Sequence, residues 1–133
     1  MTICSMNRRC TLGEIRDCEM RLSKAGQVIA ACWDEIPRHF TNTELDAFVV
    51  MPNHVHGILV LTEPRARHAS PLHVIASSFK AAVSKRVGTA VWQRNYFEHI
   101  IRSESELNGI RGYIEDNPAN WRTDHENPFR QRL

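Results

Sequence analysis

The chain has 133 residues, of which 42% are hydrophobic and 24% are charged, and its formal net charge is +2. These values favour one compact domain over residues 1–133 with its own hydrophobic core. No apolar run approaches the roughly 20 residues that a membrane helix needs, and no secretory signal opens the chain, so we expect a cytoplasmic protein without a membrane partner.

The four cysteines lie in the first quarter of the chain, at positions 4, 10, 18 and 32, and none forms a C-x-x-C pair. We interpret them as free thiols in a reducing compartment. Charge is distributed unevenly, because residues 62–102 hold seven basic residues and two acidic ones. This segment is either a surface for a polyanion or a solvated helix face, and composition leaves both open.

Residue patterns predict alternating strands and helices, ending in a polar tail over 119–133 anchored by Trp121 and Phe129. In the first half of the chain we expect a strand over 2–4, an extended arm or hairpin over 13–22, and a helix capped by Ser23 that ends near 37–40. Strands over 45–51 and His54–Leu61 follow, and then a helix that starts at Ser70-Pro71 and stops at Gly88. The last elements are a strand over 91–101 and a helix from a capping box at Ser103 to Asn117-Pro118. This order predicts an α+β fold with a ferredoxin-like β-α-β-β-α-β antiparallel sheet and an additional C-terminal helix.

A histidine pair marks the strand that follows the Pro52-Asn53 turn. His54 and His56 are two residues apart, so they project from the same face of a strand, one pleat apart. Two imidazoles at this spacing can bind one metal ion, although either can also be a structural side chain.

The last helix carries a second pair of polar residues. Tyr113 and Asn117 are four residues apart and therefore share one helix face. A phenol is a latent nucleophile, and an amide oxygen is a possible metal ligand. If this helix crosses the histidine strand, the four side chains could perform metal-assisted phosphoryl transfer through a covalent phosphotyrosine.

Each assignment has a structural alternative. Tyr113 lies beside an apolar stripe and could be a core residue, and Asn117 before Pro118 could simply end the helix. Tyr96 is the rival tyrosine, but it has no polar partner at helical spacing. Another function also stays open, a metallohydrolase that activates water with the same histidines.

Several segments together resemble a known family. The stretch 48–60, FVVMPNHVHGILV, closely resembles the histidine–hydrophobic–histidine (HUH) motif of the IS200-like single-tyrosine transposases. The stretches VWQRNYFEHIIR over 91–102 and GYIEDNP over 112–118 are similar to the REP-associated branch. The similarity extends over nearly the whole chain, including GEI at 13–15 and CWDEIP at 32–37.

This resemblance implies a ferredoxin-like fold and an enzyme that cleaves and rejoins single-stranded DNA beside hairpin-forming repeats. A domesticated, inactive module that only binds hairpin DNA stays open as an alternative. The nucleophile maps onto Tyr113, and the metal ligands map onto His54, His56 and Asn117. The family uses Mg²⁺ or Mn²⁺, whereas imidazole ligands alone would suggest a softer metal such as zinc. The family includes monomers and homodimers, so the oligomeric state is not implied.

Binding of single-stranded DNA needs basic groups for the backbone and flat side chains for the bases. Trp92 and Trp121 are candidates for base stacking, although we favour burial in the core for Trp92. Candidate backbone contacts are Arg65, Arg67, Lys80, Lys85, Arg86, Arg94 and Arg102.

Overall fold

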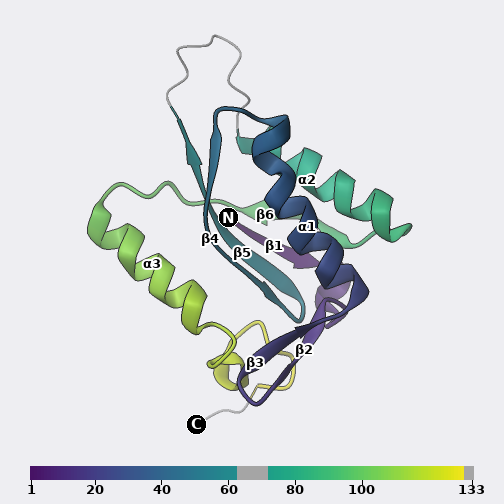
Figure 1. The fold of residues 1–133 in the computed structure, drawn as a ribbon. Helices are drawn as coiled ribbons and strands as arrows, with labels where there is room; N and C mark the ends of the chain where they lie inside the picture. The colour runs from purple at the N-terminus through teal and green to yellow at the C-terminus, as the bar shows by residue number, and fades with distance from the viewer. Residues whose placement is uncertain (63–71, 131–133) are drawn as a thin grey trace.

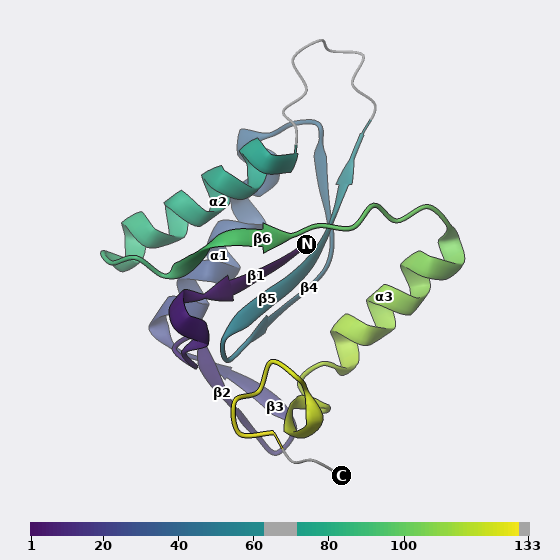
Figure 2. The same cartoon turned by 180° about the vertical axis from the view of Figure 1, so that it is seen from behind.

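A four-stranded antiparallel sheet forms the centre of the computed structural model, which describes residues 1–62 and 72–130. Its strands are β1 (Thr2–Ser5), β4 (Thr43–Met51), β5 (His54–Leu61) and β6 (Trp92–Phe97), and they lie in the order β4-β5-β1-β6. Two helices, α1 (Lys24–His39) and α2 (Leu72–Val87), lie on one face of the sheet. A third helix, α3 (Glu104–Asp116), lies apart from them beyond β4 (Figures 1 and 2). This is the expected α+β, ferredoxin-like arrangement.

A two-stranded hairpin lies between β1 and α1, formed by β2 (Gly13–Arg16) and β3 (Glu19–Leu22). Its turn residues Asp17 and Cys18 both have positive φ, 50° and 63°, as a two-residue hairpin turn of the primed type requires. The segment 13–22 is therefore a hairpin, the second of the two expected forms.

The core lies between the sheet and α1 and α2. Val50 and Val55 of the sheet contact the helices together with Ile3, and Trp33 of α1 stacks on Phe48 of β4 with ring centroids 4.2 Å apart. Side chains alternate along β5, so His54 and His56 face away from this core. The helix layer thus supports the histidine strand from behind.

Strand β6 is shorter than the expected 91–101. It ends at Phe97, which pairs with Thr2 at the beginning of β1, and residues 98–102 have no regular structure. Ile100, one of the apolar residues that suggested a longer strand, is instead 69% exposed.

The structure contains the helix starts that we expect at Ser23 and Ser103. The Ser23 hydroxyl accepts a hydrogen bond from the Gly26 amide, and the Ser103 hydroxyl accepts one from Glu106. The Glu106 carboxylate accepts from the Arg102 amide rather than from Ser103, so the capping box is displaced by one residue. Ser70-Pro71 lies outside the described residues.

The C-terminal segment folds back against the sheet. It forms a short 3₁₀ turn, Trp121–Thr123, and Asn127 is buried. The expected anchoring by Phe129 is wrong, because this ring is 85% exposed. Instead, the Glu126 carbonyl oxygen accepts a hydrogen bond from Asn53, and the Glu126 carboxylate pairs with Arg8 at 3.2 Å. Polar contacts therefore hold this tail.

Candidate functional site

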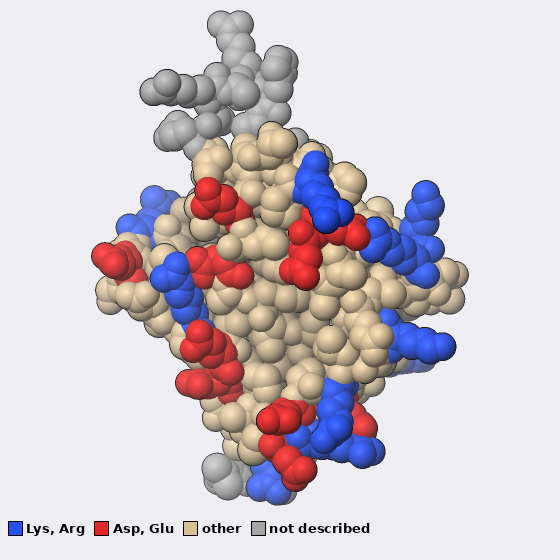
Figure 3. Space-filling model, viewed as in Figure 1, with Lys and Arg blue, Asp and Glu red and all other residues tan. Residues whose placement is uncertain are grey.

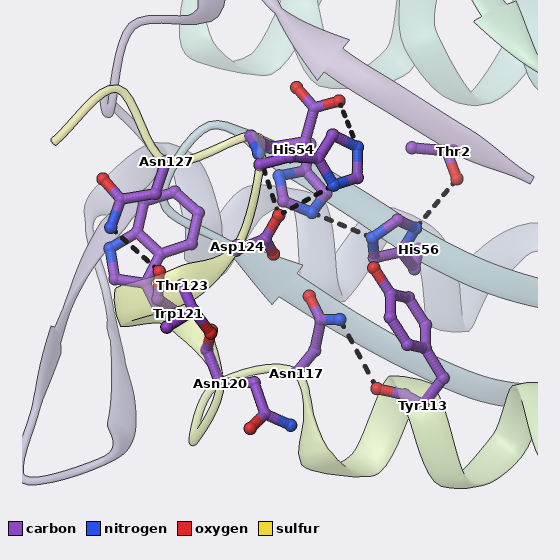
Figure 4. Close-up of polar contacts among 12 residues, drawn as sticks. Thr2, His54, His56, Tyr113, Asn117, Asn120, Trp121, Thr123, Asp124 and Asn127 are labelled. Carbon is purple, nitrogen blue, oxygen red and sulfur yellow. Dashed lines mark hydrogen bonds and ion pairs between the residues drawn. The ribbon is translucent and has the colours of Figure 1, made fainter. Parts of the chain in front are cut away.

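The two histidines of β5 lie on the open face of the sheet with their rings in contact. His54 is fully buried and His56 is partly exposed, and their Nε2 atoms are 2.9 Å apart. The other ring nitrogens are held by polar side chains. Nδ1 of His54 is 2.8 Å from Asn53 Oδ1, and Nδ1 of His56 is 2.8 Å from Thr2 Oγ1 (Figure 4). Each imidazole is thus oriented from behind, with Nε2 directed at one point.

Both rings are neutral at neutral pH. Burial lowers the pKa of His54 to about 4, with a smaller contribution from His125, while Asn117 acts in the opposite direction. Burial and, to a smaller extent, the neighbouring His54 together lower the pKa of His56 to about 3. A neutral imidazole keeps one nitrogen lone pair free, which a metal ligand needs.

Helix α3 brings Tyr113 and Asn117 to these histidines. The Tyr113 ring is centred 5.5 Å from the His56 ring, and Figure 4 shows the phenol directed toward His56. Tyr113 is 49% exposed, so the phenol is accessible from solvent. The structure therefore brings together the four side chains of the predicted catalytic and metal site.

The Asn117 side chain is buried, with an unpartnered oxygen. Its Nδ2 donates to the Tyr113 carbonyl oxygen at 3.4 Å, whereas its Oδ1 accepts no hydrogen bond from any residue that the structure describes. A buried acceptor without a donor costs about 1–3 kcal/mol, so the position needs a further explanation. A cation beside the two Nε2 atoms would satisfy this oxygen, and the residues present therefore fit a metal ion.

Sequence patterns alone missed three contributors to this site. Thr2 and Asn53 hold the histidines, and the Asp124 carboxylate lies in the tail, where its negative charge opposes the fall in the pKa of His56. The Asp124 side chain is only 5% exposed. Residues 1–62 and 72–130 contain no group of three or more His, Cys, Asp or Glu side chains that could hold a metal ion. The candidate set instead combines two histidines with an amide.

An apolar groove leads away from the candidate site between β5 and α3. It encloses about 960 Å³ and includes His56 and Tyr113 at one end. Ile58 and Val60 of β5 face Leu107 and Ile110 of α3 across it, and Arg102 lies along its wall. This size is within the range of ligand-binding clefts.

The candidate DNA contacts are dispersed over the molecule. Lys80 donates to the carbonyl oxygens of Gln93 and Arg94, and Arg86 pairs with Glu35 at 2.5 Å. Exposed positions are Lys85 and Arg86 on α2, Arg94 on β6 and Arg102 before α3, whereas Arg65 and Arg67 lie outside the described residues.

Basic and acidic side chains intermingle on the face in Figure 3, apart from a basic cluster over the side that carries α2. Burial of Trp92 in the core, the favoured interpretation, is confirmed, because this residue is 7% exposed and belongs to the core cluster. Trp121 is half-buried, 6.2 Å from the His54 ring. No helix among the described residues has the length and apolar character to span a bilayer.

The chain is similar to known proteins, although no family model matches it. An uncharacterized protein of Haemophilus influenzae is 36% identical over 146 aligned positions, which cover 93% of this chain and 81% of that protein. A second protein of Haemophilus influenzae, assigned provisionally as a REP-associated tyrosine transposase, is 26% identical over 87 positions. That match covers 57% of this chain and 49% of the relative, so the chain spans about half its length.

Among solved structures, the fold matches a REP-associated tyrosine transposase bound to a REP hairpin. The TM-score is 0.71 at 25% sequence identity, and the match covers 90% of this chain and 64% of that protein.

Proposed function

We propose that this chain is a member of the family of REP-associated tyrosine transposases and that it cleaves and rejoins single-stranded DNA beside hairpin-forming repeats through Tyr113. The observation that carries the proposal is the position of this phenol, half-exposed and directed at the His54–His56 pair. A tyrosine that served only packing would be buried in the core.

In the proposed reaction, the Tyr113 oxygen attacks the phosphorus of a phosphodiester. A bond from this oxygen to phosphorus forms, and the bond from phosphorus to the 3′ oxygen breaks. The phenol proton passes to solvent, which reaches the half-exposed ring, and the leaving 3′ oxygen takes up a proton. The product is a 5′-phosphotyrosine, which a free 3′ hydroxyl can attack in the reverse step to rejoin DNA.

His54, His56 and the Asn117 oxygen would hold a divalent ion, with Mg²⁺ or Mn²⁺ expected from the family. When bound, such an ion polarises the phosphate and stabilises the leaving oxygen. The chain's own contribution is to hold two neutral imidazoles and one unpartnered amide oxygen at one point.

Flanking nucleotides would enter the groove between β5 and α3, because it is continuous with the site through His56 and Tyr113. Its apolar walls suit unstacked bases better than phosphates. Arg102 would contact the DNA backbone along the groove.

A covalent adduct tests this proposal directly. We would incubate the protein with Mn²⁺ and an end-labelled hairpin oligonucleotide with single-stranded flanks, then separate the products on a denaturing gel. We expect a labelled protein–DNA adduct that is lost in Tyr113→Phe and retained in the matched control Tyr96→Phe, since Tyr96 packs against the core.

The two alternative functions, a metallohydrolase and a module that only binds DNA, predict different products on the gel. A metallohydrolase would give cleaved DNA without an adduct and full activity in Tyr113→Phe. A module that only binds hairpin DNA would retain the oligonucleotide uncut, and binding would be insensitive to His56→Ala. Either result would refute the proposed nucleophile.

A further inference from the structure

The orientation of the Asn53 side-chain amide is fixed by two backbone carbonyl groups. Asn53 is 1% exposed, and one end of its amide lies 2.7 Å from the Glu126 oxygen and 3.3 Å from the Arg8 oxygen. Carbonyl oxygens only accept hydrogen bonds, so the NH₂ group must face them. The amide oxygen therefore faces His54.

This orientation determines which nitrogen of His54 carries the proton. The Asn53 oxygen lies 2.8 Å from Nδ1 of His54 and can only accept a hydrogen bond. Nδ1 must therefore be protonated, and Nε2 of the neutral ring carries the lone pair. That lone pair is directed at Nε2 of His56, 2.9 Å away.

His56 is in a different situation, because its partner is a hydroxyl group that can donate or accept. Without a cation, two bare Nε2 atoms at 2.9 Å would repel, so His56 carries its proton on Nε2 and donates to His54. Nδ1 of His56 then accepts from the Thr2 hydroxyl, 2.8 Å away. The result is one directed chain of hydrogen bonds from Thr2 through both rings to Asn53 and Glu126.

We propose that Asn53 locks His54 permanently in its metal-binding tautomer, whereas Thr2 lets His56 change between two tautomers when a cation binds. To offer its Nε2 lone pair, His56 must carry its proton on Nδ1, and the Thr2 hydroxyl must rotate from donor to acceptor. The two neutral forms differ only in proton position, so the exchange needs no net proton release. Asn53 and Thr2 are thus positioning residues, and their assigned role rests on the proposed function of the site.

The lock connects the site to two distant segments of the chain. The Asn53 amide is held by Arg8 after β1 and by Glu126 in the C-terminal tail, and these two residues also form an ion pair at 3.2 Å. Displacing the tail would remove the shorter of the two bonds to the Asn53 NH₂ group. The tail therefore contributes to metal binding without supplying a ligand.

Long-range ¹H–¹⁵N correlation spectra of the histidine rings test this assignment, because they distinguish the two neutral tautomers. In the full chain without metal, we expect His54 protonated on Nδ1 and His56 on Nε2. Zn²⁺, a diamagnetic probe, should leave the proton of His54 in place and move that of His56 to Nδ1. A wild-type His54 protonated on Nε2, or a His56 that does not change with Zn²⁺, would overturn the proposal.

Variants separate the two positioning roles. Asn53→Leu should release His54 into a mixture of tautomers and weaken Mn²⁺ binding about tenfold, as the loss of a partner behind a ligand commonly does. Thr2→Val should hinder the change at His56, and Thr2→Ser should restore it. The matched controls Asn120→Leu and Thr123→Val alter exposed tail residues and should change neither spectrum nor affinity.

If Asn53→Leu does not fold, Asn53→Asp supplies the second measurement. The carboxylate keeps the acceptor for His54 but cannot donate to Glu126, so His54 should keep its tautomer while the tail contact is lost. Unchanged His54 spectra in a folded Asn53→Leu variant, or a changed tautomer in Asn53→Asp, would refute the lock. The spectra need no DNA, so they can fail while the adduct forms, or succeed while no adduct forms.

Discussion

Arg111 and Asp46 join α3 to the sheet through a two-point ion pair. Nε and Nη2 of Arg111 donate to the two carboxylate oxygens of Asp46 at 2.9 and 2.6 Å. This arginine–carboxylate geometry fixes orientation as well as distance. The Arg111 hydrogen bond also holds the pKa of Asp46 below its ordinary value. Because Arg111 is two residues from Tyr113, the pair sets where α3 presents the phenol.

Breaking this pair should therefore affect adduct formation more than stability. Arg111→Leu should slow formation of the Tyr113 adduct about tenfold or more, because small displacements of reacting groups are costly. The free energy of unfolding should change little, since the pair is partly exposed. Single-turnover gels and urea denaturation measure the two quantities.

Two further variants distinguish orientation from mere loss of charge. The exchange Asp46→Arg with Arg111→Asp should recover part of the lost rate, because the attraction is restored with altered geometry. Arg16→Leu removes an exposed ion pair with Glu14 on the hairpin and should leave the rate unchanged. Equal rates for Arg111→Leu and Arg16→Leu would contradict the positioning role.

The low pKa values of the histidines predict how stability depends on pH. His54 and His56 have pKa values of about 4 and about 3 in the folded chain, against 6.5 as the ordinary value. Between about pH 3 and pH 6.5, the unfolded chain therefore binds more protons than the folded chain. The contribution of the two neutral rings to the free energy of unfolding is fully present above about pH 6.5 and is lost as the pH falls toward 3. Urea denaturation between pH 3.5 and 7.5 measures this slope.

The matched comparison is His54→Gln against His99→Gln, because His99 is exposed. His54→Gln should flatten the decline in stability below about pH 6.5, and His99→Gln should leave it steep. Since both rings proposed to bind the metal are already neutral at pH 7, Mn²⁺ affinity should be nearly constant from about pH 6.5 to 8. A strong rise in affinity over that interval would show that the rings are charged.

Gly57 allows Trp33 to pack against the strand that carries the histidines. A Cβ atom at Gly57 would lie 2.5 Å from the Trp33 ring, which is closer than any ordinary contact. Gly57→Ala should therefore destabilise the fold by about 1–3 kcal/mol, as overpacking in a core usually does. Gly109→Ala is the control, because no atom lies within 4 Å of its Cβ position in α3. That change should stabilise by up to about 1 kcal/mol through helix propensity.

The sequence was most informative where one periodicity described a whole element. The alternation along His54–Leu61 predicted both the strand and the shared face of the two histidines, and the Ser23 and Ser103 caps marked helix starts that the structure contains. Strand β6 was predicted too long, because an apolar run cannot show where its partner strand begins. Ile100 instead contributes to the groove.

Contacts between distant segments could not be predicted from one sequence. Asn53 was expected only as a turn residue, and its bonds to Arg8 and Glu126 depend on a tail without any periodic pattern. Likewise, nothing in the spacing of Asp46 and Arg111 indicates that they meet. These contacts follow from tertiary packing, which local propensities do not specify.

Arg102 offers a test of the DNA path through the groove. It is exposed beside α3, on the groove wall that leads to Tyr113. If it contacts one phosphate, Arg102→Glu should weaken binding of single-stranded oligonucleotides and reduce the slope of log affinity against log salt by about 0.7. Arg38→Glu makes the same charge change on an exposed residue at the end of α1 and should have little effect.

Lys85→Glu, on α2 in the helix layer behind the sheet, completes this comparison. We expect it to weaken binding of an intact hairpin with its flanks, because the larger ligand can reach beyond the groove, and to affect a short single strand less. Arg102→Glu and Lys85→Glu thus separate the contacts made by single-stranded DNA from those made by the DNA hairpin. If Arg102→Glu and Arg38→Glu give the same salt slope for the single strand, DNA does not follow the groove between β5 and α3, and the apolar walls there must serve another purpose.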